Sequence, residues 1–183
     1  HNGMSVLEIG SGTGLHTYKL VKTGANITAT DISPNALEVL IKNIPIENSG
    51  SLITLIADME ALPFKDENFD AVVCAGSLSY GDRKKVDSEI RRVIKPNGLF
   101  ICVDSLNHNP IYKFNRYIRF LHGARSKMTL LNMPTIQRIN SLTKKYKYLD
   151  VKYFGCISFM MPILSKLLGD NSAADFSNYV DKI

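Results

Sequence analysis

The sequence predicts a doubly wound α/β fold, in which helices cover both faces of a mostly parallel sheet. Short runs of apolar and β-branched residues alternate with segments of helical periodicity over residues 5–103. The first run leads into a glycine-rich turn, GSGTG at positions 10–14, and a helical pattern follows the turn. At 183 residues, the chain has the size of a single domain with a sizeable core.

Five strands are expected where apolar residues cluster between turn signals. They span residues 5–9, 26–30, 52–57, 69–75 and 99–103. The segment ALPFKDENFD at 61–70 contains a proline and a polar run, which exclude a long helix between the third and fourth strands. The turn KPNG at 95–98 is expected to end a helix and lead into the fifth strand.

Helices are expected after the first, second and fourth strands. An apolar stripe that ends before Gly24 predicts the first helix, with Leu15, Tyr18, Leu20 and Val21. Ser33 and Pro34 begin the second as N-cap and first-turn residue, and its inner face comprises Leu37, Leu40, Ile41 and Ile44. Asp82 caps the third, whose inner face comprises Val86, Ile90, Val93 and Ile94.

The chain changes character near residue 104. Residues 1–104 carry 10 Lys and Arg against 13 Asp and Glu, whereas residues 105–183 carry 12 against 4. The alternation of strands and helices also ends there, which predicts a helical insertion after the fifth strand at 105–133, a further helix at 134–147 and a sixth strand at 148–154. The insertion should contain an amphipathic helix with one apolar face, formed by Ile111, Phe114, Ile118 and Leu121.

The cysteine and histidine patterns predict no metal site. Cys74, Cys102 and Cys156 are widely spaced in apolar stretches, so we expect buried, reduced thiols. The four histidines show no metal-binding spacing. No stretch of about 18 uninterrupted apolar residues predicts a membrane span, and no signal-peptide pattern opens the sequence. A cytoplasmic location is therefore predicted.

The glycine-rich turn predicts a binding site for a nucleotide-like molecule. Glycines let the backbone approach a ligand closely, and the following helix presents free N–H groups there. A dinucleotide fingerprint, G-x-G-x-x-G/A, needs its third small residue at position 15, which is Leu15, whereas the third glycine here is Gly14. The spacing disfavours a dinucleotide without excluding one.

Four segments together resemble the class I S-adenosylmethionine-dependent methyltransferases, particularly the small-molecule enzymes of the menaquinone/ubiquinone-biosynthesis group. These segments are VLEIGSGTG, TATDIS, IADMEALPFKDENFDAVVCAGSL and IRRVIKPNGLFICVD, and the resemblance covers roughly residues 4–104. It implies a Rossmann-like fold, a transferase activity and S-adenosyl-L-methionine as cofactor.

The resemblance also implies a set of cofactor-binding residues. The turn contributes Glu8, Gly10, Gly12 and Gly14; the strand ends contribute Asp31 and Ile32, Asp58 and Met59, and Ser77. Asp31 would accept both ribose hydroxyls, and Asp58 would accept the adenine amino group. Taken singly, Asp31 also fits a helix-entry residue and Asp58 the cap of a helical turn.

The catalytic residue is not identified by the sequence. A general base is expected unless the acceptor is already acidic, and the candidates are His108, Tyr80 and His16. Each histidine equally fits an exposed or structurally satisfied side chain.

Two observations bear on the acceptor. The fourth strand is followed by CAGSLSYGD, which lacks the N/D-P-P-Y/F motif of enzymes that methylate base amino groups, so nucleic acid is disfavoured. Residues 105–152 contain ten Lys and Arg, several aromatic residues and one acidic residue, Asp150. This basic segment fits a pocket for an anionic or lipid-linked acceptor, a membrane-surface patch, an RNA-binding face, or a helix that only packs on the sheet.

The prediction is a single methyltransferase domain over residues 1–183. It comprises a cofactor-binding core at 1–104, a substrate-side helical insertion at 105–147, and the last strand or strands with a tail at 148–183. Compared with the family pattern, we expect the N-terminal cap helix and the seventh strand to be missing, as in a fragment. The predicted reaction is methyl transfer to a small-molecule or lipid-linked acceptor, at oxygen. The alternatives are a nicotinamide-dependent oxidoreductase and a non-catalytic module that binds RNA or anionic membrane. The oligomeric state is not predicted.

Overall fold

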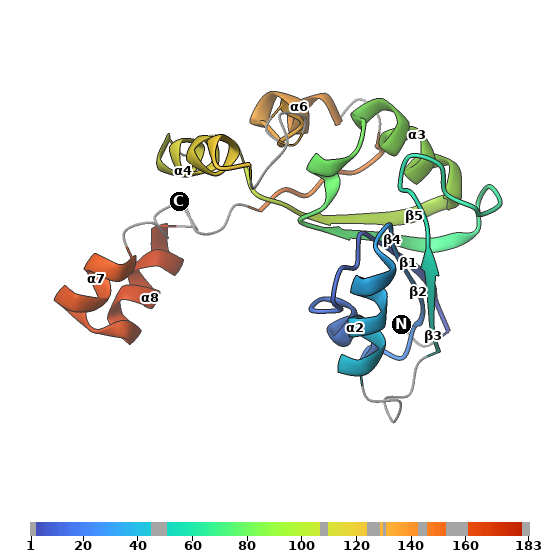
Figure 1. Ribbon diagram of the computed structural model, residues 1–183, viewed down its shortest axis with the longest axis horizontal. Coiled ribbons are helices and arrows are strands. Elements are labelled where there is room, and N and C mark those ends of the chain that lie inside the picture. Colours follow the sequence, from blue (N-terminus) through green and yellow to red (C-terminus); the bar gives the residue numbers. More distant parts are fainter. Residues whose placement is uncertain are drawn as a thin grey trace. The chain divides into compact units, whose positions relative to one another are not determined.

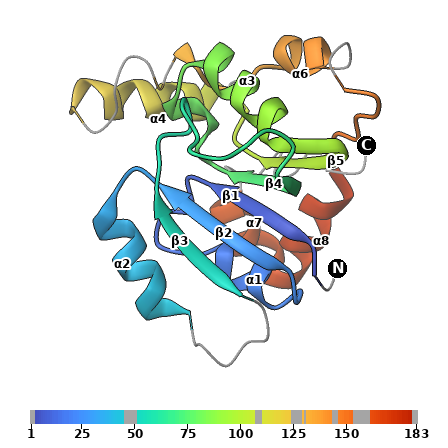
Figure 2. The ribbon, with the colours of Figure 1, turned by 90° about the vertical axis from the view of Figure 1, so that its right-hand side faces the viewer.

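Five parallel strands form one sheet in the order β3-β2-β1-β4-β5 (Figure 2). The computed structural model describes residues 3–44, 51–106, 110–123, 129, 131–142, 146–152 and 161–180. The strands are β1 (Ser5–Ile9), β2 (Asn26–Asp31), β3 (Leu52–Ile56), β4 (Phe69–Ala75) and β5 (Ile94–Val103). Strands that alternate with helices in this order confirm the predicted doubly wound, Rossmann-like class.

Helices cover both faces of the sheet, as predicted. Helices α1 (Thr17–Val21) and α2 (Pro34–Asn43) lie on one face, and the 3₁₀ helix η1 (Leu78–Tyr80) and α3 (Arg83–Val93) lie on the other; α2 and α3 are seen on opposite sides in Figure 1. Neighbouring residues of β1 belong to different cores, because successive strand side chains point to opposite faces: Val6 packs with α2 and Leu7 with α3.

The predicted helix caps are confirmed. The Ser33 hydroxyl accepts a hydrogen bond from the Ala36 backbone N–H at 3.3 Å. The Asp82 carboxylate accepts from two N–H groups in the first turn of α3. The predicted inner face of α2 is wrong at one position, because Ile41 is exposed while Leu37, Leu40 and Ile44 are buried. The buried stripe of this ten-residue helix is narrower than the apolar pattern suggested.

Two elements differ from the sequence prediction. Helix α1 has only five residues, because the turn continues to His16, and Leu15 and Tyr18 of the expected stripe are exposed. Strand β5 begins at Ile94 rather than at residue 99. Asn97 adopts a left-handed backbone conformation, with φ 62°, and the register with β4 shifts there. The residues of the KPNG turn, 95–98, therefore lie inside β5, where the pairing with β4 is irregular.

The predicted burial of the cysteines holds for Cys74 but not for Cys102. Cys74 is buried on β4, whereas Cys102 is exposed on β5. Strand β5 is the last strand of the sheet among the described residues, so its side chains have fewer neighbours. Cys156 lies outside the described residues.

The described chain divides into two compact units. The first comprises His1–Ser105 and Arg125–Pro134, and the second comprises Leu106–Ala124 and Thr135–Ile183. The second contains the helices α4 (Pro110–Leu121), α6 (Ile136–Leu142), α7 (Met161–Leu168) and α8 (Asp170–Val180). Helix α4 matches the predicted helix of the insertion. Helices α7 and α8 contact each other across the turn at Gly169.

The predicted sixth strand is wrong over residues 148–152, which form no strand, and residues 153 and 154 lie outside the described residues. The apolar alternation in this segment is short, and residues 148–152 pair with none of the described strands. Within the described ranges, none of the helices has the length and apolar character that crossing a bilayer would require.

Candidate functional site

A cavity of about 450 Å³ lies at the carboxyl ends of the parallel strands. This is where ligands bind in open α/β sheets. Its lining comes from the ends of β1, β2, β3 and β4 and from the residues that follow them: Gly10, Gly12, Thr30, Asp31, Ile32, Ala57, Asp58, Met59, Glu60, Ala75, Gly76, Ser77, Tyr80 and Gly81. The structure therefore brings together seven of the nine predicted cofactor-binding residues; Glu8 and Gly14 are not part of the lining.

Gly10 lies where the end of β1 meets the residues after β4. It has φ +65°, and a Cβ there would lie 2.4 Å from both Cβ and Oγ of Ser77. The Ser77 hydroxyl donates to the Ile9 carbonyl at 3.0 Å. This contact holds the two strand ends together, and only glycine leaves room for it.

Asp31 is held by the glycine turn and by the start of α2. Its Oδ2 accepts from the Gly12 N–H at 2.8 Å, and its Oδ1 accepts from the Ser33 N–H at 2.9 Å. An ionised carboxylate can accept about four hydrogen bonds. About two acceptor positions therefore remain for a ligand, one on each oxygen.

Gly14 has a packing role in this structure. It has φ +90°, and a Cβ there would lie 2.8 Å from Cγ of Leu40. Leu40 is fully buried on α2. Gly14 thus lets the turn lie against α2.

Glu8 lies behind the turn, and it is 1% exposed. Its Oε2 accepts a hydrogen bond from the Thr17 hydroxyl at 2.5 Å. Burial raises the pKa of this carboxyl from 4.5 to about 7, because the charged form is desolvated, and the Thr17 hydrogen bond offsets part of the rise. Near neutral pH the group is divided between its protonated and ionised forms.

The segment after β3 forms another wall of the cavity. The Asp58 carboxylate accepts from the Glu60 N–H at 2.8 Å. Glu60 accepts from the Asp82 N–H at 2.7 Å and from Lys85 Nζ at 3.1 Å, and these bonds lower its pKa. The Met59 side chain lies near Gly81, where a Cβ would come within 3.2 Å of its sulfur.

Arg92 of α3 anchors this segment, and sequence reasoning missed it. Its guanidinium donates to the carbonyls of Leu62 at 2.9 Å and Phe64 at 2.6 Å, and it pairs with Asp66 and Glu89. The two carboxylates raise the pKa of the guanidinium further above its ordinary value. Leu62 and Phe64 lie 30 and 28 positions from Arg92 in sequence, so no local pattern could have indicated these contacts.

The three candidate bases have different outcomes. Tyr80 lines the cavity and is 63% exposed. His16 stands at the N-cap position of α1, makes no capping hydrogen bond there, and is not among the residues that line the cavity. His108 lies outside the described residues.

Residues 131–134 belong to the first unit and contact the rim of the cavity. Asn132 donates from its side chain to the Gly81 carbonyl at 2.9 Å. Arg83 donates to the carbonyls of Leu131 and Met133. The segment predicted as a substrate-side insertion thus contributes residues next to the cavity.

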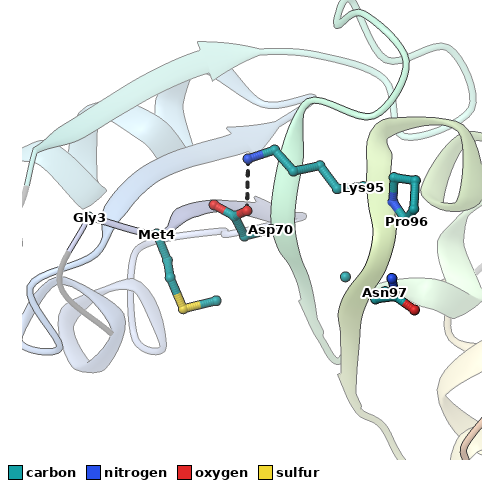
Figure 3. A pocket seen from close by; sticks show the side chains of 7 residues that line it. Gly3, Met4, Asp70, Lys95, Pro96 and Asn97 are labelled. Carbon is teal, nitrogen blue, oxygen red and sulfur yellow. Dashed lines mark hydrogen bonds and ion pairs between the residues drawn. The ribbon is translucent and has the colours of Figure 1, made fainter.

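A second cavity, of about 430 Å³, lies at the amino ends of β1 and β4 (Figure 3). Lys95 Nζ points to Asp70 there and pairs with it at 2.7 Å, and Asp70 also accepts from the Ser5 N–H at 2.8 Å. Because Lys95 and Asp70 pair with each other, we assign both side chains a structural role and no ligand-binding role. No cluster of three metal-ligating side chains occurs among the described residues.

Comparison with known proteins adds a family assignment to this geometry. The model of the methyltransferase domain family matches residues 7–102, more than half of the chain. A demethylmenaquinone methyltransferase from Lactococcus lactis is 32% identical over 175 residues, which cover 82% of this chain and 68% of that protein.

Other relatives are named for different acceptors. A sterol 4-C-methyltransferase from Caenorhabditis elegans is 30% identical, over 77% of this chain and 43% of its own length. A malonyl-[acyl-carrier protein] O-methyltransferase from Buchnera aphidicola is 33% identical, over 73% and 52%. This chain spans only about half the length of these two relatives.

A solved structure of similar fold is a SAM-dependent methyltransferase from Methanosarcina mazei. Its TM-score is 0.55 at 25% identity, and the match covers 67% of this chain and 61% of that one.

Proposed function

This chain belongs to the methyltransferase domain family, and on that basis we propose that it transfers a methyl group from S-adenosyl-L-methionine to a small-molecule or lipid-linked acceptor. The observation that carries the proposal is the cavity in which a bare glycine turn faces aspartates from two neighbouring strand ends. Its volume of about 450 Å³ falls in the range of small-molecule sites.

The donor and acceptor groups of the cavity fit this cofactor. A vicinal diol can donate one hydrogen bond to each Asp31 oxygen, because each oxygen already holds only one backbone N–H. Ile32, which is 70% exposed at the rim, offers an apolar surface for a nucleobase. Asp58 would accept the amino group of that base, and Met59 would supply its backbone N–H to the ring.

The other end of the cavity suits the methionine moiety. Gly10 and Ser77 both line the cavity, so their backbone groups would hold the methionine moiety. Glu8 does not line the cavity, so its part is to order the turn through Thr17.

The bound cofactor would supply an activated methyl group for an in-line displacement. The chain's residues would align it with the acceptor and exclude water, and such positioning can lower a barrier by roughly 7 to 11 kcal/mol. The glycine turn, Asp31 and the Arg92-anchored segment supply this alignment.

We propose an acidic oxygen as the acceptor, because the described lining offers little for a general base. Its titratable side chains are Asp31, Asp58, Glu60 and Tyr80, and each of the three carboxylates is held by backbone N–H groups. A carboxylic acid or an acidic phenol loses its proton without help. One relative is named an O-methyltransferase and another a 4-C-methyltransferase, so the family accommodates both atoms.

Calorimetry with S-adenosylhomocysteine tests the cofactor part. The chain should bind it, Asp31→Ala should weaken binding by at least tenfold, and Glu38→Ala, which removes a carboxylate from the exposed side of α2, should leave it unchanged. Asp31→Asn keeps an oxygen acceptor but loses the charge, so it should weaken binding less than Asp31→Ala does. Binding of NADH without any binding of S-adenosylhomocysteine would refute the proposal in favour of an oxidoreductase.

A transfer assay with methyl-labelled S-adenosylmethionine tests the acceptor part. Carboxylic acids and acidic phenols should become labelled, including forms with lipid chains. Mild alkali should release labelled methanol from a methyl ester, and mass spectrometry identifies phenol ethers. Label that is confined to carbon or nitrogen contradicts an oxygen acceptor. Cofactor binding without labelling of any acceptor, together with salt-sensitive binding to RNA or anionic vesicles, favours a non-catalytic module.

A further inference from the structure

Two cysteines face each other on neighbouring strands beside the cavity. Cys74 of β4 and Cys102 of β5 are register partners in the parallel pair. Neighbouring strands lie about 4.8 Å apart, which is inside the range of roughly 4.4–6.8 Å between Cα atoms that a disulfide requires. Register partners also point to the same face of a sheet. The backbone therefore already satisfies the main geometric condition for a bond between them.

The environment of the pair favours reaction. Cys102 is exposed, so a reagent in solution can reach it, while Cys74 is buried. Hydrogen bonding with Cys102, and to a smaller extent with Ser77, lowers the pKa of the Cys74 thiol, although burial acts in the opposite direction. The thiolate is the form that attacks a disulfide. The pair thus combines an accessible sulfur, that of Cys102, with a second thiol, that of Cys74, whose pKa is lowered.

Cys74 is also linked to the cavity. Its sulfur lies 3.0 Å from the Ser77 hydroxyl, which in turn donates to the Ile9 carbonyl at 3.0 Å. Ser77 lines the cavity and fills the space beside Gly10. A change at the Cys74 sulfur is therefore only one contact away from the proposed methionine end of the site.

We propose that Cys74 and Cys102 are a modification site, where a low-molecular-weight disulfide such as oxidised glutathione drives formation of an internal disulfide, and that this bond weakens cofactor binding. The second part rests on the proposed function, whereas the first does not. The new bond draws the Cys74 sulfur to covalent distance from Cys102 and removes its hydrogen atom, so its contact with Ser77 is weakened.

The reaction balances as two thiol–disulfide exchanges. The Cys102 thiolate attacks one sulfur of oxidised glutathione, forms a mixed disulfide and releases one glutathione thiolate. The Cys74 thiolate then attacks the Cys102 sulfur, forms the internal bond and releases the second glutathione thiolate. The two leaving thiolates take up the two protons that the cysteines lost. The cysteine pair is oxidised and one molecule of oxidised glutathione is reduced.

Mass spectrometry after tryptic digestion tests the bond. The full chain treated with oxidised glutathione should lose the mass of two hydrogen atoms, and peptide 66–83 should be joined to peptide 93–113. Calorimetry on the same sample should show about fivefold weaker binding of S-adenosylhomocysteine, the effect of one lost hydrogen bond. Dithiothreitol should restore both.

Cys102→Ala cannot form the bond, and its affinity should not respond to the oxidant, whereas Cys156→Ala should respond like the parent chain. Absence of the joined peptides, or joining through Cys156, overturns the proposal. A joined pair with unchanged affinity refutes the link to the cavity. A reduced chain that binds no S-adenosylhomocysteine refutes the proposed function, and the joined peptides then still decide the disulfide.

Discussion

Alanine in place of Gly10 would add a methyl group where the structure has no space for one. The added Cβ would lie 2.4 Å from Ser77 Cβ, an atom attached directly to the backbone after β4. Rotation of the Ser77 side chain cannot relieve that overlap, so the backbone at the end of β1 or after β4 has to move. The hydrogen bond from Ser77 to the Ile9 carbonyl, at 3.0 Å, would be disturbed by either movement.

Two costs add at this position. A side chain at φ +65° costs about 1–2 kcal/mol in the left-handed region. Overpacking a tight contact costs about 1–3 kcal/mol more. The sum of roughly 2–5 kcal/mol is a large part of the 5–15 kcal/mol that stabilises a typical domain.

Gly12→Ala is the matched control, because Gly12 lies in the same turn with φ +55° but a Cβ there would meet nothing within 4 Å. It should lose only the backbone part, about 1–2 kcal/mol. Urea unfolding followed by far-UV circular dichroism measures both variants against the parent chain. If Gly10→Ala is no less stable than Gly12→Ala, the steric account of the glycine turn is wrong.

Three further predictions concern buried charge, an anchored segment and a helix cap. The raised pKa of Glu8, about 7 against 4.5, means that its stabilising effect is complete below pH 4.5 and is lost as the pH rises through 7. The free energy of unfolding should therefore fall by about 3 kcal/mol as the pH rises. Urea titrations at pH 5 and pH 8 measure this decrease, and Glu8→Gln should abolish it. Arg92→Met should speed tryptic cleavage after the exposed Lys65, because the segment loses its anchor. Asp82→Ala should cost about 1 kcal/mol in urea unfolding through the lost cap.

The predictions for Glu8 and Arg92 each have a control variant. Glu38→Gln should leave the pH dependence intact, because that side chain is exposed on α2. Arg91→Met changes the neighbour of Arg92 on α3, and it should not alter cleavage after Lys65. Equal pH profiles for Glu8→Gln and the parent chain contradict the buried-carboxyl assignment. Unchanged stability of Asp82→Ala contradicts the capping contribution.

Sequence reasoning succeeded where the determining interactions are local. The cap at Ser33 depends on an acceptor three residues before the Ala36 N–H. The alternation of strands and helices likewise reflects apolar periods within each segment. The early start of β5 depends on pairing of Ile94 with Phe69 of another strand, so the same local patterns could not indicate it. The anchor at Arg92 is missed for the same reason.

In the candidate site, too, the sequence motif indicated which residues lie near one another but not which of them line the cavity. The resemblance grouped Glu8 with Gly12 and Asp31, but only the last two line the cavity. Glu8 is two residues from Gly10 along the chain, yet its side chain points from β1 toward Thr17. A motif gives the order of residues, whereas the lining of the cavity depends on position along the strand: Glu8 lies within β1, and Gly10 and Gly12 lie beyond its carboxyl end.

The three glycines of the turn satisfy three separate constraints, and this explains why a spacing of G-x-G-x-G differs physically from a dinucleotide fingerprint. Gly10 makes room for Ser77 after β4, Gly12 adopts φ +55° where its N–H donates to Asp31 at 2.8 Å, and Gly14 makes room for Leu40 of α2. Leu40 belongs to α2, whereas the helix that directly follows the turn is α1. In the dinucleotide pattern, the third small residue serves the close packing of the helix that directly follows the turn. The position of the third glycine therefore follows from where α2 crosses the turn. Replacing Leu40 by alanine would remove that requirement, so Gly14→Ala should be less damaging in a Leu40→Ala background than in the parent chain, measured as a coupling free energy in urea unfolding.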